Sequence, residues 1–354
     1  MTQDVYDRLA LHLDNLPGGF PSTKSGVEMR ILKRLFTEDE ATLACHLRMM
    51  PEPVERIAKR VSLPAEELAE KLYQMSHKGL IFRLDVPEGP RYMAAQYVVG
   101  IWEYHVNNLD EGLIKDMNEY TPYLLDASLK LKTNQLRTIP IGASLGGKGT
   151  VMPYEEARKL IEQQSKIVLA PCICRREHSM VGQGCGKLPE ACLVFSSGAY
   201  FYEKNGLGRS ITHEEALRIL KKAEEEALVL QPTNAQRIMA MCLCCGDCCQ
   251  VLKSLKRMPK PATLVHTNYF AKIRKEECIG CETCLDRCQM EAITIQDDIA
   301  EIDPDRCIGC GLCFPTCSAE AIDLIRKDEK DCYTPPDNVI ETYRCIARER
   351  GLIK

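Results

Sequence analysis

The sequence predicts an α+β protein of four successive parts, at residues 1–92, 93–262, 263–330 and 331–354. Three observations support this division. Apolar residues recur at helical spacing, between capping residues and prolines, through the first part. The second part alternates strand-like apolar runs with capped helices and carries nine cysteines, so we expect an α/β region rich in cysteine. The third part repeats a run of four cysteines, and the fourth carries one amphipathic helix.

The first part contains the helical signals in their clearest form. After a short leader that ends near residue 21, we expect helices that begin near residue 27 and then occupy residues 38–49, 53–61 and 64–78. Thr37 and Glu40 have the spacing of a capping box, and Gly79 follows the last helix as a C-terminal cap would. Residues 80–89 then form a strand and a hairpin tip.

The order of these elements resembles a winged helix-turn-helix domain over about 70 residues, which implies a helix that could enter a DNA groove. That helix begins with Glu66, Glu67 and Glu70. DNA phosphates would repel these carboxylates, and the region has no excess of lysine and arginine. We therefore expect a structural or protein-interaction role for residues 1–92 and regard DNA as an unlikely partner.

The second part combines helical and strand signals. Residues 93–133 have helical character, and we expect a strand at 137–141, a helix at 153–164, a buried strand at 167–170, a helix at 216–227 and a strand at 228–230. Thr212 and Glu215 form a capping-box pattern before the last helix. The glycine-rich stretch 142–149 lacks the spacing of a phosphate-binding loop, so we interpret it as a connector.

Nine cysteines of the second part exceed what a hydrophobic core uses, and five of them fall within eight positions. We expect them to bind metal. They are Cys172, Cys174, Cys185, Cys192, Cys242, Cys244, Cys245, Cys248 and Cys249. The thiols suffice for one or two iron–sulfur clusters, or for a structural zinc site made, for example, by the first four. Arg175 and Arg176, next to Cys174, would complement an anionic metal centre.

The third part carries the most specific motif. Cys278, Cys281, Cys284 and Cys288 form one run, and Cys307, Cys310, Cys313 and Cys317 repeat it 29 residues later. The repeat extends to the flanking residues, which indicates duplication of a whole unit. Four thiols at this spacing are typical of iron–sulfur clusters, whereas zinc sites use two Cys-x2-Cys pairs with a longer gap.

Residues from about 268 to 326 resemble a bacterial-type ferredoxin module with two [4Fe–4S] clusters. The resemblance implies one cluster on Cys278, Cys281, Cys284 and Cys317, and another on Cys307, Cys310, Cys313 and Cys288. The ferredoxin pattern usually has proline after each fourth cysteine, and here Gln289 and Ser318 occupy those positions. Proline shapes the backbone but binds no metal, so the ligand sets are unaffected.

This resemblance favours iron–sulfur over zinc for the nine thiols of the second part as well, so we expect one or two additional clusters there. Cys244-Cys245-Gly246 is similar to the CCG motif of heterodisulfide-reductase-type proteins, which hold unusual clusters that act on substrate. The flanking spacings differ from that family. A basic stretch after Cys249, with Lys253, Lys256, Arg257 and Lys260, is a candidate docking surface for an acidic electron partner.

The last part contains two prolines, Pro335 and Pro336, and then an amphipathic helix at residues 338–350. We expect this helix to dock on the ferredoxin module or on a partner. The lone cysteines Cys45, Cys332 and Cys345 are interpreted as packing residues.

Composition limits the function further. The net charge is only -4, the first residues lack a secretory signal, and no apolar stretch is long enough to span a membrane. Twenty cysteines without such a signal favour metal binding in a reducing cytoplasm over disulfides. The layout resembles multi-cluster ferredoxin-like proteins of anaerobes. It implies a non-catalytic electron carrier, or an electron-transfer subunit of a larger oxidoreductase, with a redox partner such as a flavoprotein.

Two other functions stay open. The segment from Cys242 to Cys249 could hold a substrate-binding cluster of a reductase, or the winged-helix-like part could make the chain a cluster-sensing DNA-binding regulator. No dinucleotide fingerprint or nucleophile–base motif is present, so no catalytic residue is assigned.

Overall fold

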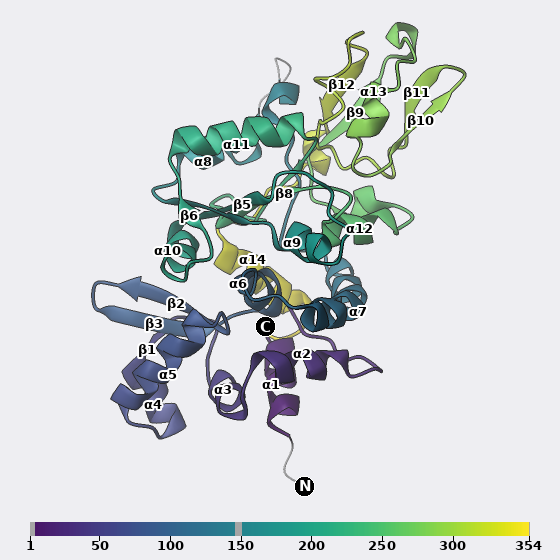
Figure 1. The fold of residues 1–354 in the computed structure, drawn as a ribbon. Helices are drawn as coiled ribbons and strands as arrows, with labels where there is room; N and C mark the ends of the chain where they lie inside the picture. Colours follow the sequence, from purple (N-terminus) through teal and green to yellow (C-terminus); the bar gives the residue numbers. More distant parts are fainter. Residues whose placement is uncertain (1–3, 146–150, 354) are drawn as a thin grey trace. The chain divides into compact units, whose positions relative to one another are not determined.

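Helix accounts for 43% and strand for 17% of the computed structural model, which confirms the α+β class. The structure describes residues 4–145 and 151–353. They form two units (Figure 1). Unit 1 consists of residues 1–133, 197–208 and 343–354, and unit 2 of residues 134–196 and 209–342. The boundaries predicted at residues 92 and 262 fall inside units 1 and 2, respectively.

Unit 1 begins with helices. They are α1 (Val5–Asp14), α2 (Val27–Leu35), α3 (Glu38–Ala44), α4 (Val54–Val61) and α5 (Ala65–His77). Helix α1 occupies the stretch expected to be a leader, and its buried Leu9 and Leu13 explain why it forms. The capping box of Thr37 and Glu40 is present at the start of α3. That helix ends at Ala44, earlier than the periodicity suggests.

Unit 1 also contains a small sheet and further helices. β1 (Glu52–Pro53), β2 (Ile81–Val86) and β3 (Gly89–Ala94) form an antiparallel sheet in the order β1-β3-β2. The winged-helix resemblance stays a prediction. A single π-type turn (Tyr97–Ile101), α6 (Trp102–Tyr104) and α7 (Glu111–Leu129) follow. Part of α10 (Ser196–Lys204) also belongs here.

The C-terminal helix α14 (Val339–Glu349) was expected to dock on the ferredoxin module or on a partner. Its residues from 343 onward belong to unit 1, and docking on a partner stays a prediction. There Arg350 donates hydrogen bonds to the backbone of Asp14 and Leu16, and Glu349 accepts from the backbone of Lys132 and Thr133. These polar contacts join the chain end to the N-terminal region.

Unit 2 is built on a five-stranded sheet. Its strands are β6 (Arg209–Ser210), β4 (Ile167–Pro171), β5 (Glu190–Phe195), β8 (Ala240–Cys244) and β7 (Val229–Pro232), in that spatial order. Every pairing is antiparallel, which differs from the α/β arrangement expected for residues 93–262. A short connection joins β7 to β8, whereas a helix lies in each of the connections from β4 to β5, from β5 to β6 and from β6 to β7.

Helices cover both faces of this sheet. α8 (Ala157–Glu162) and α11 (His213–Glu225) lie side by side on one face, and α9 (Ile173–Met180) and α12 (Gln250–Lys256) lie on the other (Figure 1). Thr212 accepts the expected N-cap hydrogen bond from Glu215. The strand predicted at 137–141 is reduced to isolated bridges. In the connector 142–149, residues 142–145 form a 3-10 turn, and the rest lies outside the described residues.

The C-terminal part of unit 2 has four short strands. β9 (Tyr269–Ile273) pairs with β12 (Ile322–Arg326), and β10 (Ile293–Gln296) pairs with β11 (Ile299–Ile302). α13 (Thr283–Arg287) follows the first cysteines. Further 3-10 turns occupy Pro153–Glu155, Pro261–Leu264, Lys275–Glu277 and Glu329–Asp331. Among the described residues, no helix combines the length and the apolar character needed to span a membrane.

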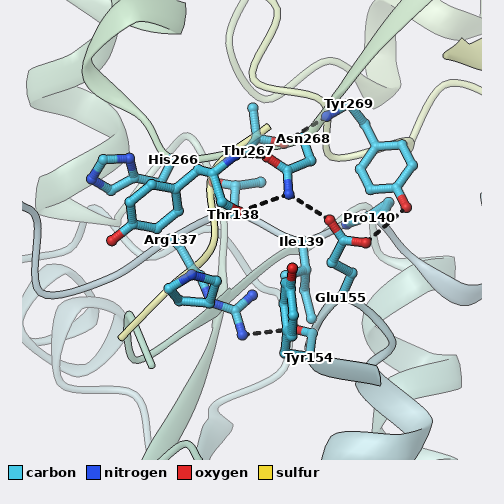
Figure 2. A pocket seen from close by; sticks show the side chains of 12 residues that line it. Arg137, Thr138, Ile139, Pro140, Tyr154, Glu155, His266, Thr267, Asn268 and Tyr269 are labelled. Atoms are coloured by element: carbon cyan, nitrogen blue, oxygen red, sulfur yellow. Dashed lines mark hydrogen bonds between the residues drawn. The ribbon is translucent and has the colours of Figure 1, made fainter. Parts of the chain in front are cut away.

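A buried polar cluster around Glu155 contacts the strands β9 and β12. Figure 2 shows Glu155 with Asn268 and Tyr269. The Glu155 carboxylate, in the turn before α8, accepts hydrogen bonds from the Asn268 amide at 2.6 Å and from the Tyr269 hydroxyl at 3.3 Å. It also pairs with the Arg326 guanidinium at 2.5 Å. The pocket beside these residues has a volume of only about 10 Å³, which is too small for a ligand. We therefore assign the cluster a structural role.

Candidate iron–sulfur and metal-thiolate sites

The first set of ferredoxin thiols surrounds Cys284, a residue in α13. The pKa of the Cys284 thiol is raised, first by burial and then by the neighbouring thiols of Cys281, Cys278 and Cys317. Three of these thiols come from the first run, and the fourth comes from the end of the second run. The structure therefore brings together the four residues that the ferredoxin resemblance implies.

The second set surrounds Cys313. Its pKa is raised, first by burial and then by the neighbouring thiols of Cys310, Cys307 and Cys288. Here Cys288 crosses from the first run, as the resemblance implies. The Cys284 thiol also lies close enough to raise this pKa, so the two sets are adjacent.

Four backbone N–H groups donate hydrogen bonds to these thiols, and the 29-residue repeat relates them in pairs. The bonds run from Ala271 to Cys307, from Ala300 to Cys278, from Ala292 to Cys288 and from Ala321 to Cys317, at 3.4, 3.4, 3.2 and 3.2 Å. Such bonds stabilise thiolates and tune cluster potentials. We did not identify these donors from the sequence, although the repeat of the alanines was a usable signal.

The same repeat explains two glycines. Gly280 and Gly309 have φ angles of +64° and +65°, and a Cβ atom at either position would collide with a backbone carbonyl, of Asp298 or of Tyr269. Glycine is needed at both positions because it alone allows this backbone conformation and this close approach. The loops can then fold tightly around each set of thiols.

The two sets differ in their exposure to solvent. Cys281 is exposed, and the neighbouring Ile279 side chain has 67% of its surface accessible. Cys310, which corresponds to Cys281 in the repeat, is half-buried, and burial raises its pKa to about 12, whereas Cys284 and Cys313 are equally buried. The first set therefore approaches the surface, while the second lies deeper in unit 2.

The nine thiols of the second predicted part divide into two groups. The larger, which we name the six-thiol group, contains Cys172, Cys174, Cys192, Cys242, Cys244 and Cys249. The strands explain half of it: Cys192 in β5 is paired with Cys242 in β8, and Cys244 lies two residues further on β8. Because side chains alternate along a strand, these three share one face of the sheet.

The other members of the six-thiol group come from the helices on this face. Cys172 and Cys249 are the N-cap residues of α9 and α12. The pKa of Cys249 is lowered well below its usual value, because its thiolate accepts hydrogen bonds from Cys174 and Cys244. The pKa of each donor is correspondingly raised. The group is a continuous set of thiol contacts, with more thiols than one cube needs.

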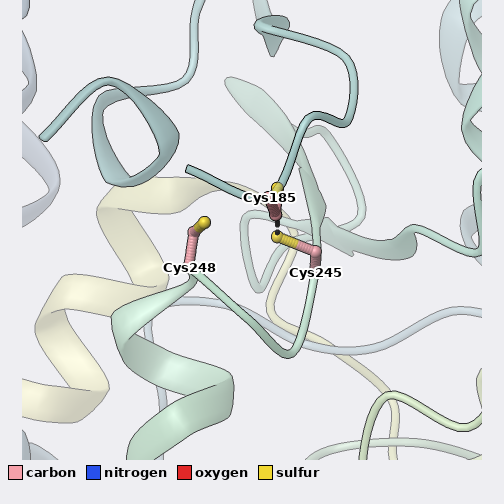
Figure 3. A group of neighbouring side chains, drawn as sticks. All are labelled: Cys185, Cys245 and Cys248. Carbon is pink, nitrogen blue, oxygen red and sulfur yellow. Dashed lines mark hydrogen bonds between the residues drawn. The ribbon is translucent and has the colours of Figure 1, made fainter. Parts of the chain in front are cut away.

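The remaining cysteines, Cys185, Cys245 and Cys248, form what we name the three-thiol group (Figure 3). Cys185 lies in the loop between α9 and β5, and the other two lie in the turn between β8 and α12. Their sulfur atoms all lie within 4.8 Å of one another, and those of Cys185 and Cys245 are 3.8 Å apart. The example zinc set of Cys172, Cys174, Cys185 and Cys192 is thus split between two groups.

Arg175 lies between the two groups. It is only 3% exposed, and its guanidinium donates hydrogen bonds to the carbonyls of Leu188 and Leu243. Burial by itself would lower the pKa of Arg175, but the thiols of Cys172 and Cys245 raise it above its usual value. The charge therefore stabilises thiolates in both groups. The prediction that Arg175 complements an anionic centre agrees with this position.

Gln289 links the three-thiol group to the ferredoxin thiols. Its buried side chain accepts a hydrogen bond of 2.6 Å from the backbone N–H of Gly246, which lies between Cys245 and Cys248. A Cβ atom on Gly246 would lie 2.5 Å from the Gln289 carbonyl oxygen, so the two segments touch. Gln289 directly follows Cys288 and occupies the usual proline position, where proline could not make this side-chain bond.

Comparison with known proteins supports the assignment of the C-terminal sites. Residues 277–347 match the family described as the 4Fe-4S dicluster domain. No curated protein and no solved structure matches the chain. The matched residues include all eight ferredoxin thiols and cover less than half of the chain. This part of the protein is an iron–sulfur, ferredoxin-like module that binds [4Fe–4S] clusters.

Proposed function

We propose that the protein transfers single electrons through two [4Fe–4S] clusters of this module. One cluster is held by Cys278, Cys281, Cys284 and Cys317, and the other by Cys307, Cys310, Cys313 and Cys288. The observation that carries the proposal is the crossed grouping of the thiols, with equivalent N–H donors on each set. Bound clusters would supply one-electron redox chemistry, and no further catalytic group is needed.

The difference in exposure between the two sets suggests where a redox partner would exchange electrons with the module. The exposed Cys281 and Ile279 mark where a redox partner protein would dock, because electron transfer needs close approach. The partner would be a flavoprotein or another part of a larger oxidoreductase, in the reducing cytoplasm of an anaerobe. The six-thiol group would hold at least one additional iron–sulfur cluster, with Arg175 offsetting its negative charge.

The basic stretch after Cys249 is a weaker candidate for the docking surface. Lys253 contacts His178 at 2.9 Å, Lys256 pairs with Glu291 at 2.7 Å, and Lys260 pairs with Asp305 at 2.8 Å. These charges already have partners within unit 2. We therefore place the docking surface at Cys281 and Ile279 instead.

Residues 1–92 would serve as a protein-interaction part of the molecule. The side chains of Glu66, Glu67 and Glu70 at the start of α5 are exposed, so this end of the helix presents carboxylates to solvent. DNA would be repelled there. This argues against a DNA-binding regulator.

Anaerobic iron analysis with electron paramagnetic resonance (EPR) tests the proposed function. The reduced full-length chain should contain about eight irons in the ferredoxin module, with further iron in the six-thiol group. Cys281→Ser should remove about half of the ferredoxin-type spin signal. Cys45→Ser, at a lone half-buried thiol of unit 1, should leave it unchanged. A wild-type chain with fewer than about eight irons would refute the proposal of two clusters.

A second candidate function is a reductase in which a metal centre of the Cys242–Cys249 segment binds substrate. The separate three-thiol group favours it, because three thiols are fewer than a closed tetrahedral site requires.

A further inference from the structure

We propose that Cys185, Cys245 and Cys248 bind a single zinc ion and leave its fourth coordination position to a ligand from outside the chain. Zinc binds thiolates at about 2.3 Å in tetrahedral geometry, which places two bound sulfurs about 3.8 Å apart. The sulfur atoms of Cys185 and Cys245 are 3.8 Å apart, and Cys248 lies within 4.8 Å of both. The group therefore already has nearly the spacing that one ion needs.

This spacing separates the three-thiol group from the cluster sites. In a [4Fe–4S] cube each thiolate binds a different iron, so the sulfurs stand further apart than around one ion. Consistent with this, no other group of three His, Cys, Asp or Glu ligand atoms within 4.8 Å exists in residues 4–145 and 151–353. The ferredoxin thiols, which surround cubes, do not meet this limit. A single ion is the better occupant of the three-thiol group.

Among residues 4–145 and 151–353, no fourth ligand lies at this spacing. Within the described residues the group contains three thiols only, and the residues outside the description include no His, Cys, Asp or Glu. Three protein ligands with an open position are the arrangement of catalytic zinc sites, whereas structural zinc sites have four. Asp247, in the same turn, pairs with Lys187 at 3.1 Å.

The charges near the site suggest which ligand it takes. Three thiolates give a zinc ion a net charge of minus one, and the buried Arg175 guanidinium beside Cys245 offsets that charge. A soft, thiolate-rich site favours sulfur as its next ligand. We therefore expect a small thiol, bound as its thiolate after losing a proton to solvent, with water in its place when no thiol is present.

The three-thiol group lies next to the second set of ferredoxin thiols. Gly246, between two of the ligands, is bonded to Gln289, which directly follows Cys288 of the second ferredoxin set. A bound thiol would lie near the deeper end of the electron path. The binding of zinc and of a thiol at this site does not depend on the proposed electron transfer.

Zinc analysis and X-ray absorption at the zinc edge test the inference on the full-length chain, purified anaerobically. The wild-type chain should hold about one zinc, with three sulfur neighbours and one oxygen or nitrogen neighbour. Adding 2-mercaptoethanol should convert this set to four sulfurs. Cys185→Ser should lower the zinc content at least about fivefold, with iron content and EPR spins unchanged. Cys45→Ser is the matched control and should keep the zinc.

Cys185→His provides a second variant, because histidine is itself a zinc ligand. It should retain zinc with one sulfur neighbour fewer than wild type. Absence of zinc from the wild-type chain would overturn the inference. So would four sulfur neighbours before any thiol is added, or the loss of about four irons in Cys185→Ser, which would assign the thiols to a cube. A wild-type chain that holds zinc but shows no ferredoxin EPR signals would refute only the proposed function.

Discussion

The contact between Gly246 and Gln289 supports a quantitative prediction. In Gly246→Ala, the new Cβ atom would lie 2.5 Å from the Gln289 carbonyl oxygen, closer than the 3.0 Å that Cβ atoms keep from other heavy atoms. Both segments are backbone, so a side chain cannot simply turn away. The loop that carries Cys245 and Cys248 must therefore move away from the ferredoxin module.

Two costs follow from this movement. Overpacking a well-filled contact costs about 1–3 kcal/mol. The hydrogen bond from the Gly246 N–H to the Gln289 side chain, now 2.6 Å long, would stretch or break, at a net cost of about 1 kcal/mol. For a unit of this size, each kcal/mol lowers the thermal midpoint by about 2–4 °C, so we expect a decrease of about 4–16 °C.

In the assay, each variant is heated anaerobically, and the decrease in cluster absorbance reports unfolding. The heating rate is the same for all variants, because cluster loss is irreversible and the apparent midpoint depends on the rate. Gly142→Ala is the matched control: a Cβ atom there has no neighbour within 4 Å, and the backbone does not need glycine. The control should stay within about 2 °C of the wild-type midpoint. If both variants melt with the wild type, the contact does not hold the two segments together.

Three other predictions concern single residues. Glu155→Gln should destabilise unit 2 by about 3–5 kcal/mol, because it leaves Arg326 without its buried partner; the same heating assay measures this loss. Gly309→Ala should lower iron content by roughly half, whereas Gly182→Ala, with a similar positive φ but no close neighbour, should not. The pKa of Glu52 is lowered mainly by its bond to Arg60, so this pair stabilises unit 1 above the usual pKa and ceases to do so as pH falls through the lowered value. Glu52→Gln should therefore flatten acid unfolding below about pH 4.5, as followed by the fluorescence of Trp102, the single tryptophan; an unchanged acid profile would contradict this assignment.

Local signals in the sequence predicted many elements correctly. The capping box at Thr37, the helix after Thr212 and the buried strand β4 are confirmed, because each depends on residues a few positions apart. Longer-range features were predicted less well. Helix α1 was missed, and the sheet of unit 2 is antiparallel instead of part of an α/β arrangement.

The ferredoxin module could be recognised from the sequence alone, since its cysteine spacing and its 29-residue repeat encode the chemistry locally. The division of the other nine thiols could not. Cys185 meets Cys245 across 60 positions, and the pairing of β5 with β8 decides that Cys192 joins Cys242 instead. In the sequence, Gln289 is only a departure from the proline of the ferredoxin pattern. The structure gives the residue a role, because its side chain accepts a hydrogen bond from the Gly246 N–H. The sequence determines the number and spacing of the cysteines. Which thiols share a site depends on which strands and loops become neighbours, and tertiary packing decides that.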